Sequence, residues 1–132
     1  MLNLPSSLRI FVAREPADMR KGFDGLSGLV MDVIDEDPQS GHVFVFFNKR
    51  RDRVKLLVWD RYGYWIMYKR IEHGRFRIYD QASEDKNSFE MRAVDLSLLL
   101  EGIDLRGSRR RLSHDEIVQR EQKPLLRATV RA

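Results

Sequence analysis

The stretch VFVFFNKRRDRVKLLVWD, residues 43–60, decides the fold because it predicts two paired β-strands joined by a charged turn. Residues 43–48 and 54–60 are rich in β-branched and aromatic side chains, which favour strands. A link this short joins only antiparallel neighbours. Apolar residues at successive positions are typical of a sheet interior that is covered on both faces. The sequence therefore predicts a central β-hairpin with a basic tip.

Further strands are expected on both sides of this hairpin. Residues 64–71 and 75–79 follow after short turns and extend it as an antiparallel meander. In the second of these, Phe76 and Ile78 alternate with Arg75 and Arg77, as in a strand with one buried face. Residues 9–13 predict a separate short strand, and a further edge strand is expected shortly before residue 94.

Two helices complete the predicted fold. Apolar residues recur at helical spacing between Met19 and Ile34, with Asp18 or Asp24 as the N-cap. Three glycines in this stretch, at 22, 25 and 28, favour close packing of another element against the helix. A shorter helix is expected over 94–101, followed by Gly102 in the position that favours glycine.

The fold class predicted from these elements is α+β, with a single domain over residues 1–106. It combines a mostly antiparallel β-meander of four to six strands, one long helix packed on the meander and a second short helix near the C-terminus. Residues 107–132 form a basic tail that is expected to be flexible or to become ordered on a partner.

The composition excludes several classes of protein. The chain has no cysteine, so disulfides and thiolate metal sites are excluded, and no apolar run is long enough to span a membrane. No nucleotide-binding, hydrolase or zinc-protease motif is present, and the three histidines lie far apart in the sequence. We therefore expect a cytoplasmic protein that is not an enzyme, needs no cofactor or metal and does not bind a membrane.

Positive charge is concentrated in two parts of the chain. Residues 49–79 hold ten basic and three acidic residues, a net charge of +7, and residues 105–132 hold eight and three, a net charge of +5. A hairpin that carries arginine and lysine fits a DNA groove or follows a phosphate backbone. The candidate DNA-binding residues are therefore those of the hairpin, those of the two following strands and a basic run in the tail: Lys49, Arg50, Arg51, Arg53, Lys55, Lys69, Arg70, Arg75, Arg77, Arg109, Arg110 and Arg111.

Two other interpretations of the basic hairpin stay open. Its charges suit an acidic protein surface as well as DNA, which would make the chain an interaction module that organises a complex without touching DNA. The charges also suit a solvated turn that discourages aggregation. A carboxylate cluster built on Asp60 with Asp24 or Asp32 would suit metal-dependent nuclease chemistry, but a turn role for Asp60 is favoured.

The order of motifs resembles a known family. Four stretches carry the resemblance: DMRKGFDGLSGLV (18–30), SGHVFVFFNKRRDRVKLLVWD (40–60), GYWIMYKRIEHGRF (63–76) and LLLEGIDL (98–105). Together they are similar to the small TnpB-type accessory protein of bacterial insertion sequence 66 transposons. This accessory protein is distinct from the RNA-guided nuclease of the same name. The resemblance covers about residues 5–106.

This resemblance implies a non-enzymatic accessory role in transposition, with the phosphodiester chemistry carried out by a separate transposase. It implies DNA at the element ends, or non-specific duplex, as one partner, and the transposase and another accessory protein as further partners. The family's basic loop matches residues 49–53 and Lys55, and its later basic motif matches Lys69, Arg70 and 74–76. The oligomeric state, a homodimer included, is left open.

Overall fold

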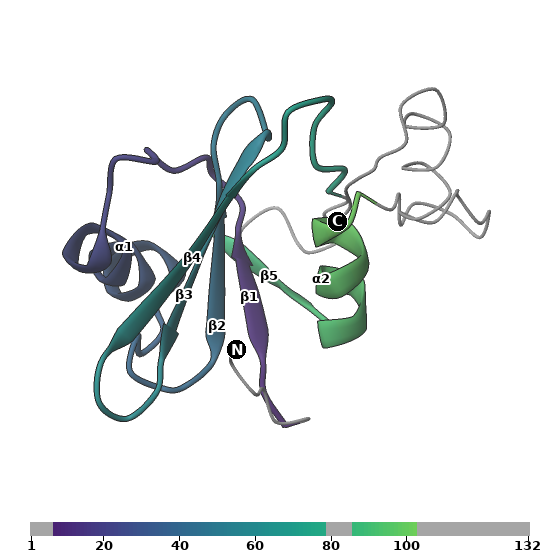
Figure 1. The fold of residues 1–132 in the computed structure, drawn as a ribbon. Coiled ribbons are helices and arrows are strands. Elements are labelled where there is room, and N and C mark those ends of the chain that lie inside the picture. Colours follow the sequence, from purple (N-terminus) through teal and green to yellow (C-terminus); the bar gives the residue numbers. More distant parts are fainter. Residues whose placement is uncertain (1–6, 79–85, 103–132) are drawn as a thin grey trace.

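A five-stranded sheet with the strand order β4-β3-β2-β1-β5 forms the middle layer of the protein. The computed structural model describes residues 7–78 and 86–102 (Figure 1). The strands are β1 (Ile10–Ala13), β2 (Val43–Phe47), β3 (Arg53–Trp59), β4 (Tyr64–Arg70) and β5 (Ser88–Met91). All neighbours are antiparallel except β1 and β2, which run parallel. The α+β class and the mostly antiparallel sheet predicted from the sequence are confirmed.

The central hairpin predicted over 43–60 is confirmed as β2 and β3. Phe47 pairs with Val54 next to the turn, and Phe44 pairs with Leu57 further along the ladder. Every residue of β2 is buried, as are all residues of β3 except those at its two ends. This double burial explains why successive positions are apolar rather than alternating with polar residues.

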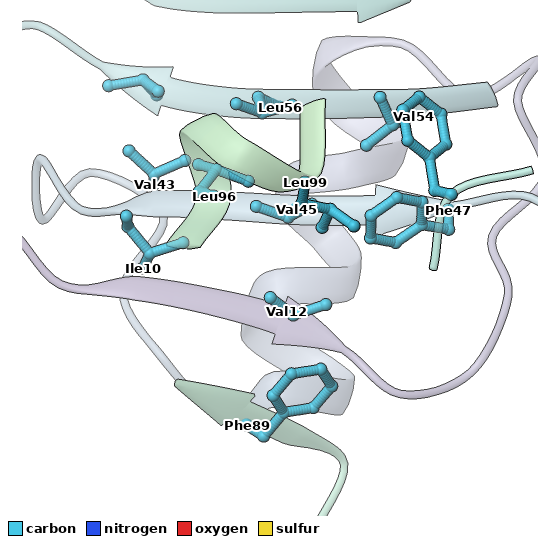
Figure 2. Close-up of a cluster of buried hydrophobic side chains, with 12 residues drawn as sticks. Ile10, Val12, Val43, Val45, Phe47, Val54, Leu56, Phe89, Leu96 and Leu99 are labelled. Carbon is cyan, nitrogen blue, oxygen red and sulfur yellow. The ribbon is translucent and has the colours of Figure 1, made fainter. Parts of the chain in front are cut away.

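Two separate apolar layers cover the sheet. On one face, Phe44, Phe46 and Leu57 pack against Leu26 and other residues of the first helix. On the opposite face, Val45 and Val54 pack against Leu96 and Leu99 of the last helix, as Figure 2 shows. Because successive residues of a strand point to opposite faces, each of the inner strands supplies both layers. The sheet is therefore held between helices on its two sides.

The first helix is shorter than the sequence predicts. It comprises α1 (Phe23–Leu29), which continues as a π-helical turn, η1 (Val30–Ile34). Neither of the two predicted N-caps, Asp18 and Asp24, is the N-cap. The Asp18 carboxylate accepts hydrogen bonds from the backbone and guanidinium of Arg20, which holds this segment in a turn, and Asp24 lies within the first turn of α1. Gly22 takes the N-cap position instead.

The second helix, α2 (Ala93–Leu100), lies within one residue of its predicted bounds. Gly102 has a φ of 86°, the left-handed conformation expected after a helix end. The preceding edge strand is β5, which pairs with β1. The predicted tail, residues 107–132, lies outside the described part of the chain.

The predicted strand over 75–79 is wrong for residues 75–78, the part that the structure describes. Phe76 donates its backbone N–H to the Arg51 carbonyl at 2.7 Å, and Ile71 donates to the Asp52 carbonyl at 2.9 Å. These bonds fasten the segment to the turn of the central hairpin instead of to the edge of β4. The predicted alternation is nevertheless present, because Phe76 is buried against Phe47 while Arg75 and Arg77 are exposed.

Lys55 is a structural residue and not a surface cation. Its side chain lies on the α1 face of β3, and the residue is only 8% exposed. The ammonium donates to the Met19 carbonyl at 2.7 Å and to the Lys21 carbonyl at 2.8 Å, and it lies 4.7 Å from the centre of the Tyr68 ring. A buried charge is tolerated when it is paired in this way. Lys55 therefore ties the segment before α1 to the sheet.

The burial of Lys55 yields a stability prediction. Lys55→Met should lower the free energy of unfolding by about 2 kcal/mol, because two carbonyls lose a charged hydrogen-bond donor. The same substitution at the exposed Lys49 should change it by less than about 0.5 kcal/mol. Urea unfolding of the two variants measures the difference, and equal values would contradict the structural role of Lys55.

The glycines of α1 yield a second prediction, because the expected close packing against them is absent at Gly28. A Cβ added there meets no atom within 4 Å. Gly28→Ala should therefore raise the free energy of unfolding by about 0.5–1 kcal/mol through the lower entropy of the unfolded chain. Gly102→Ala, at a φ of 86°, should lower it. Denaturant midpoints measure both, and a destabilised Gly28→Ala would indicate an unseen neighbour.

Candidate nucleic-acid interface

The turn of the β2–β3 hairpin is organised by one side chain, that of Asn48. Its amide oxygen accepts the backbone N–H groups of Asp52 and Arg53, each at 3.0 Å. Its amide nitrogen donates to the Asp52 carboxylate at 2.6 Å. The turn is closed further by a hydrogen bond from the Arg51 N–H to the Asn48 carbonyl. The tip therefore has a defined shape before any partner is present.

Arg51 occupies a backbone conformation that disfavours it. Its φ is 60°, in the left-handed region where glycine and asparagine are the usual residues. Placing an arginine there costs free energy that glycine would avoid. The local backbone thus gives no reason for an arginine at this position, as it gives none for Arg61, whose φ is 90° in the β3–β4 turn.

A second segment places more cations beside the tip. Residues 71–78 leave the end of β4 and are fastened to the hairpin turn through the backbone bonds of Ile71 and Phe76. The Phe76 ring is 2% exposed and contacts the Phe47 ring edge-on, with 5.5 Å between ring centres. Its two neighbours, Arg75 and Arg77, are consequently held at the surface next to the hairpin turn.

The structure therefore brings cations from three segments to one end of the sheet, the end where β2 stops and β3 begins (Figure 1). We call this group the basic end and define it by its exposed members: Lys49, Arg50, Arg51, Arg70, Arg75 and Arg77. The β3–β4 turn, with Arg61, and the start of α2, with Arg92, lie at the other end of the sheet.

Few acidic groups neutralise the basic end. Among the described residues, ion pairs within it involve Arg50 with Asp52, at 4.0 Å, and Arg70 with Glu72, at 3.0 Å. The Asn48 amide, together with the charge of Arg50, holds the pKa of the Asp52 carboxyl below its usual range. Asp52 is thus ionised at neutral pH, but it is engaged chiefly by Asn48. Lys49, Arg51, Arg75 and Arg77 have no acidic partner in the described part of the chain.

Arg53 and Arg70 lie directly opposite each other in the β3–β4 ladder. Like charges in this arrangement destabilise a sheet unless something offsets their repulsion. Arg53 is partly buried and donates to the Tyr68 hydroxyl at 3.4 Å, while Arg70 is turned towards Glu72. An anion bound between the two guanidinium groups would offset the repulsion further.

Lys69 belongs to the other face of the sheet. It pairs with Val54, and its ammonium donates to the Leu100 carbonyl at the C-terminal end of α2, at 2.6 Å. A cation in this position also interacts favourably with the helix dipole. Together with the buried Lys55, it is thus removed from the set of freely available cations. Arg109, Arg110 and Arg111 lie outside the described residues.

Two residues at this end were not singled out in the sequence. Asn48 shapes the turn, and Arg14 lines a small cavity of about 30 Å³ together with Asn48 and Arg51. The asparagine at the start of a hairpin turn is a sequence signal for such a role. The position of Arg14 depends on the end of β1 lying next to the end of β2, which requires the topology.

Asp60 has the turn role favoured by the sequence. Its carboxylate accepts the backbone N–H groups of Tyr62 and Gly63, and the Trp65 indole N–H at 2.6 Å. These bonds hold its pKa below the usual range. Across residues 7–78 and 86–102, no three acidic or histidine side chains come together as metal ligands would. No helix in these ranges has the length and apolar character required to cross a membrane.

Comparison with known proteins identifies relatives over most of the chain. An uncharacterized protein of Sinorhizobium fredii, y4jC, is 36% identical over 104 residues, which cover 79% of this chain and 86% of the relative. A second protein of the same organism, y4hO, also uncharacterized, is 32% identical over 106 residues, covering 80% and 90%. No solved structure matches the chain.

A family model described as IS66 Orf2 like protein matches residues 8–110, a range that contains both the central hairpin and the basic end. This agrees with the resemblance found in the sequence motifs, and it indicates an accessory role in transposition. The chain belongs to the IS66 Orf2-like protein family.

Proposed function

We propose that this protein binds DNA through the basic end as a non-enzymatic accessory factor of transposition. In this proposal, phosphate groups neutralise the exposed cations of the hairpin turn and of residues 75–77. The strand-transfer chemistry belongs to a separate transposase, with which the protein cooperates at the ends of the element.

The observation that carries the proposal is the concentration of exposed cations on a preformed support. Six of them share one end of the sheet, and the turn that bears three is shaped by Asn48 rather than by its own charges. Mutual repulsion among these side chains is relieved when phosphates supply the opposite charge.

The contacts expected from this surface are with the DNA backbone. Lysine and arginine side chains that neutralise phosphates fix the position of a protein on a duplex without reading its sequence. If all six cations contacted phosphates, the logarithm of the binding constant would fall with the logarithm of salt concentration with a slope of about −5. Binding to the element ends and to scrambled duplex should therefore be similar.

One test of the DNA-binding proposal compares two charge-matched double variants. Arg50→Glu with Arg51→Glu should weaken binding to both duplexes and make the salt slope shallower by about 2. Arg61→Glu with Arg92→Glu changes the net charge equally but at the other end of the sheet, and should leave binding close to that of the native protein. Fluorescence anisotropy at several salt concentrations measures both.

Equal effects of the two double variants would mean that net charge, and not the basic end, governs binding. Absence of duplex binding by the native protein at low salt would contradict the proposal. In that event the basic end would be better explained as a surface for an acidic region of a partner protein.

A further test of the proposal separates the binding role of Arg51 from the cost of its backbone conformation to stability. Arg51→Gly should leave the free energy of unfolding unchanged or raise it by up to about 1 kcal/mol, because glycine adopts a φ of 60° without strain. The same variant should bind duplex DNA more weakly and show a salt slope shallower by about 1. Urea unfolding and anisotropy on one preparation test both, and a clear loss of stability would contradict the account of this turn.

A further inference from the structure

One edge of the sheet is long, and its charges are confined to the last two residues, Lys69 and Arg70, so that its centre lacks the features that normally protect an edge. β4 spans seven residues and lies at the end of the strand order, with no partner on its outer side among the described residues. Exposed edges are usually protected by charges, prolines, bulges or short length. The opposite edge strand, β5, has such protection: it has only four residues, and Glu90 within it forms an ion pair with Arg9.

The centre of β4 is apolar on both faces. Ile66 and Met67 are partly exposed, and Trp65 and Tyr68 are 52% and 50% exposed. Met67 lies on the α2 face of the sheet and Ile66 on the α1 face. The four residues from 65 to 68 carry no charge, and all of β4 carries no acidic residue. This edge therefore offers unpaired backbone groups together with apolar side chains above and below them.

We propose that a second copy of this chain pairs with β4 edge to edge, forming a two-fold symmetric dimer with a continuous ten-stranded sheet centred on Met67. The proposal concerns an interaction surface and does not depend on DNA binding. It follows from the geometry of antiparallel pairing and from the order of charges along β4.

Symmetry restricts the register. In an antiparallel pair, directly opposite residues project from the same face. A two-fold axis must therefore pass midway between the two copies of one residue, so that this residue faces itself across the joint. An axis at Met67 pairs all seven residues of β4 with their counterparts. An axis at Ile66 or Tyr68 leaves two strand residues of each copy without a strand partner. The register centred on Met67 thus uses the whole edge.

The same register keeps like charges apart. It sets Lys69 and Arg70 opposite Trp65 and Tyr64 of the second copy, so that no cation faces another cation, and sets Ile66 opposite Tyr68. Parallel pairing in register would instead place each cation opposite its own copy, which is repulsive. A second copy in the antiparallel arrangement is therefore the occupant that this edge fits.

Such a dimer would carry two basic ends. Each basic end lies where β4 finishes and β3 begins, and antiparallel pairing points these strand ends in opposite directions. The two cationic surfaces would then lie at opposite ends of the shared β4–β4 joint, so that one dimer could contact two duplex segments.

Sedimentation and cysteine cross-linking test the proposal, and the native chain helps because it has no cysteine. Native protein should change from monomer to dimer as its concentration is raised. Met67→Cys places the new thiol opposite its own copy, at a separation that a disulfide can span. This variant should form a disulfide-linked dimer on mild oxidation much faster than Val94→Cys, although position 94 on α2 is the more exposed of the two.

A second variant covers the case in which Met67→Cys disturbs the fold. Trp65→Lys places a cation opposite Lys69 of the second copy and should shift the equilibrium towards monomer. Trp65→Glu, which removes the same indole but places a carboxylate opposite Lys69, should keep the dimer. A native chain that sediments as a monomer at every concentration, or equal cross-linking of Met67→Cys and Val94→Cys, would overturn the proposal.

Discussion

The burial of β2 and β3 on both faces is the constraint on which the rest of the structure depends. Helices α1 and α2 cover opposite sides of these strands, so a shift of either strand by one residue would exchange the side chains of the two layers. Such a shift of β3 would also turn Lys55 away from its carbonyl partners on the α1 face. This fixed register places the turn between the strands at a defined end of the sheet. The charged tip can therefore be rigid although its own side chains repel one another.

The same end of the sheet shows how the fold assembles charge from separate parts of the sequence. Phe76 is buried against Phe47, and its backbone is bonded to the hairpin turn, so that arginines more than twenty positions from the tip lie beside it. The fold itself uses Lys55 and Lys69 in internal hydrogen bonds, so these two lysines do not belong to the exposed cations at this end. What remains is a group of arginines and one lysine at one end of the sheet with few acidic neighbours.

Local patterns in the sequence predicted the parts of the fold that depend on local physics. The apolar runs of β2 and β3 and the glycine after α2 were sufficient to place those elements. The strand–helix–strand order before residue 48 also contained the signal for the parallel pairing of β1 and β2, because such a connection crosses over to a parallel neighbour. Of the two predicted N-caps of α1, Asp24 lies two residues from the observed N-cap, Gly22, whereas the Asp18 carboxylate is used by Arg20 instead of by a helix.

The candidate site was predictable in composition but not in arrangement. A lysine inside an apolar run that is buried on both faces, as at position 55, is a signal for internal pairing, yet its carbonyl partners lie 34 and 36 residues away. The alternation of apolar and basic residues at 75–78 predicts a strand, but in the structure the backbone of this segment is hydrogen-bonded to the hairpin turn. Spatial partners of this kind are set by the tertiary fold.

The basic end as a single preformed binding surface is tested most directly by amide chemical shifts of the isotope-labelled protein during titration with a short duplex. We expect duplex to change the amide chemical shifts of residues 48–53 and 70–77. The amide shifts of residues 60–63 and 92–94, at the other end of the sheet, should stay constant. Changes spread evenly over both ends, or confined to residues remote from the hairpin turn, would contradict it.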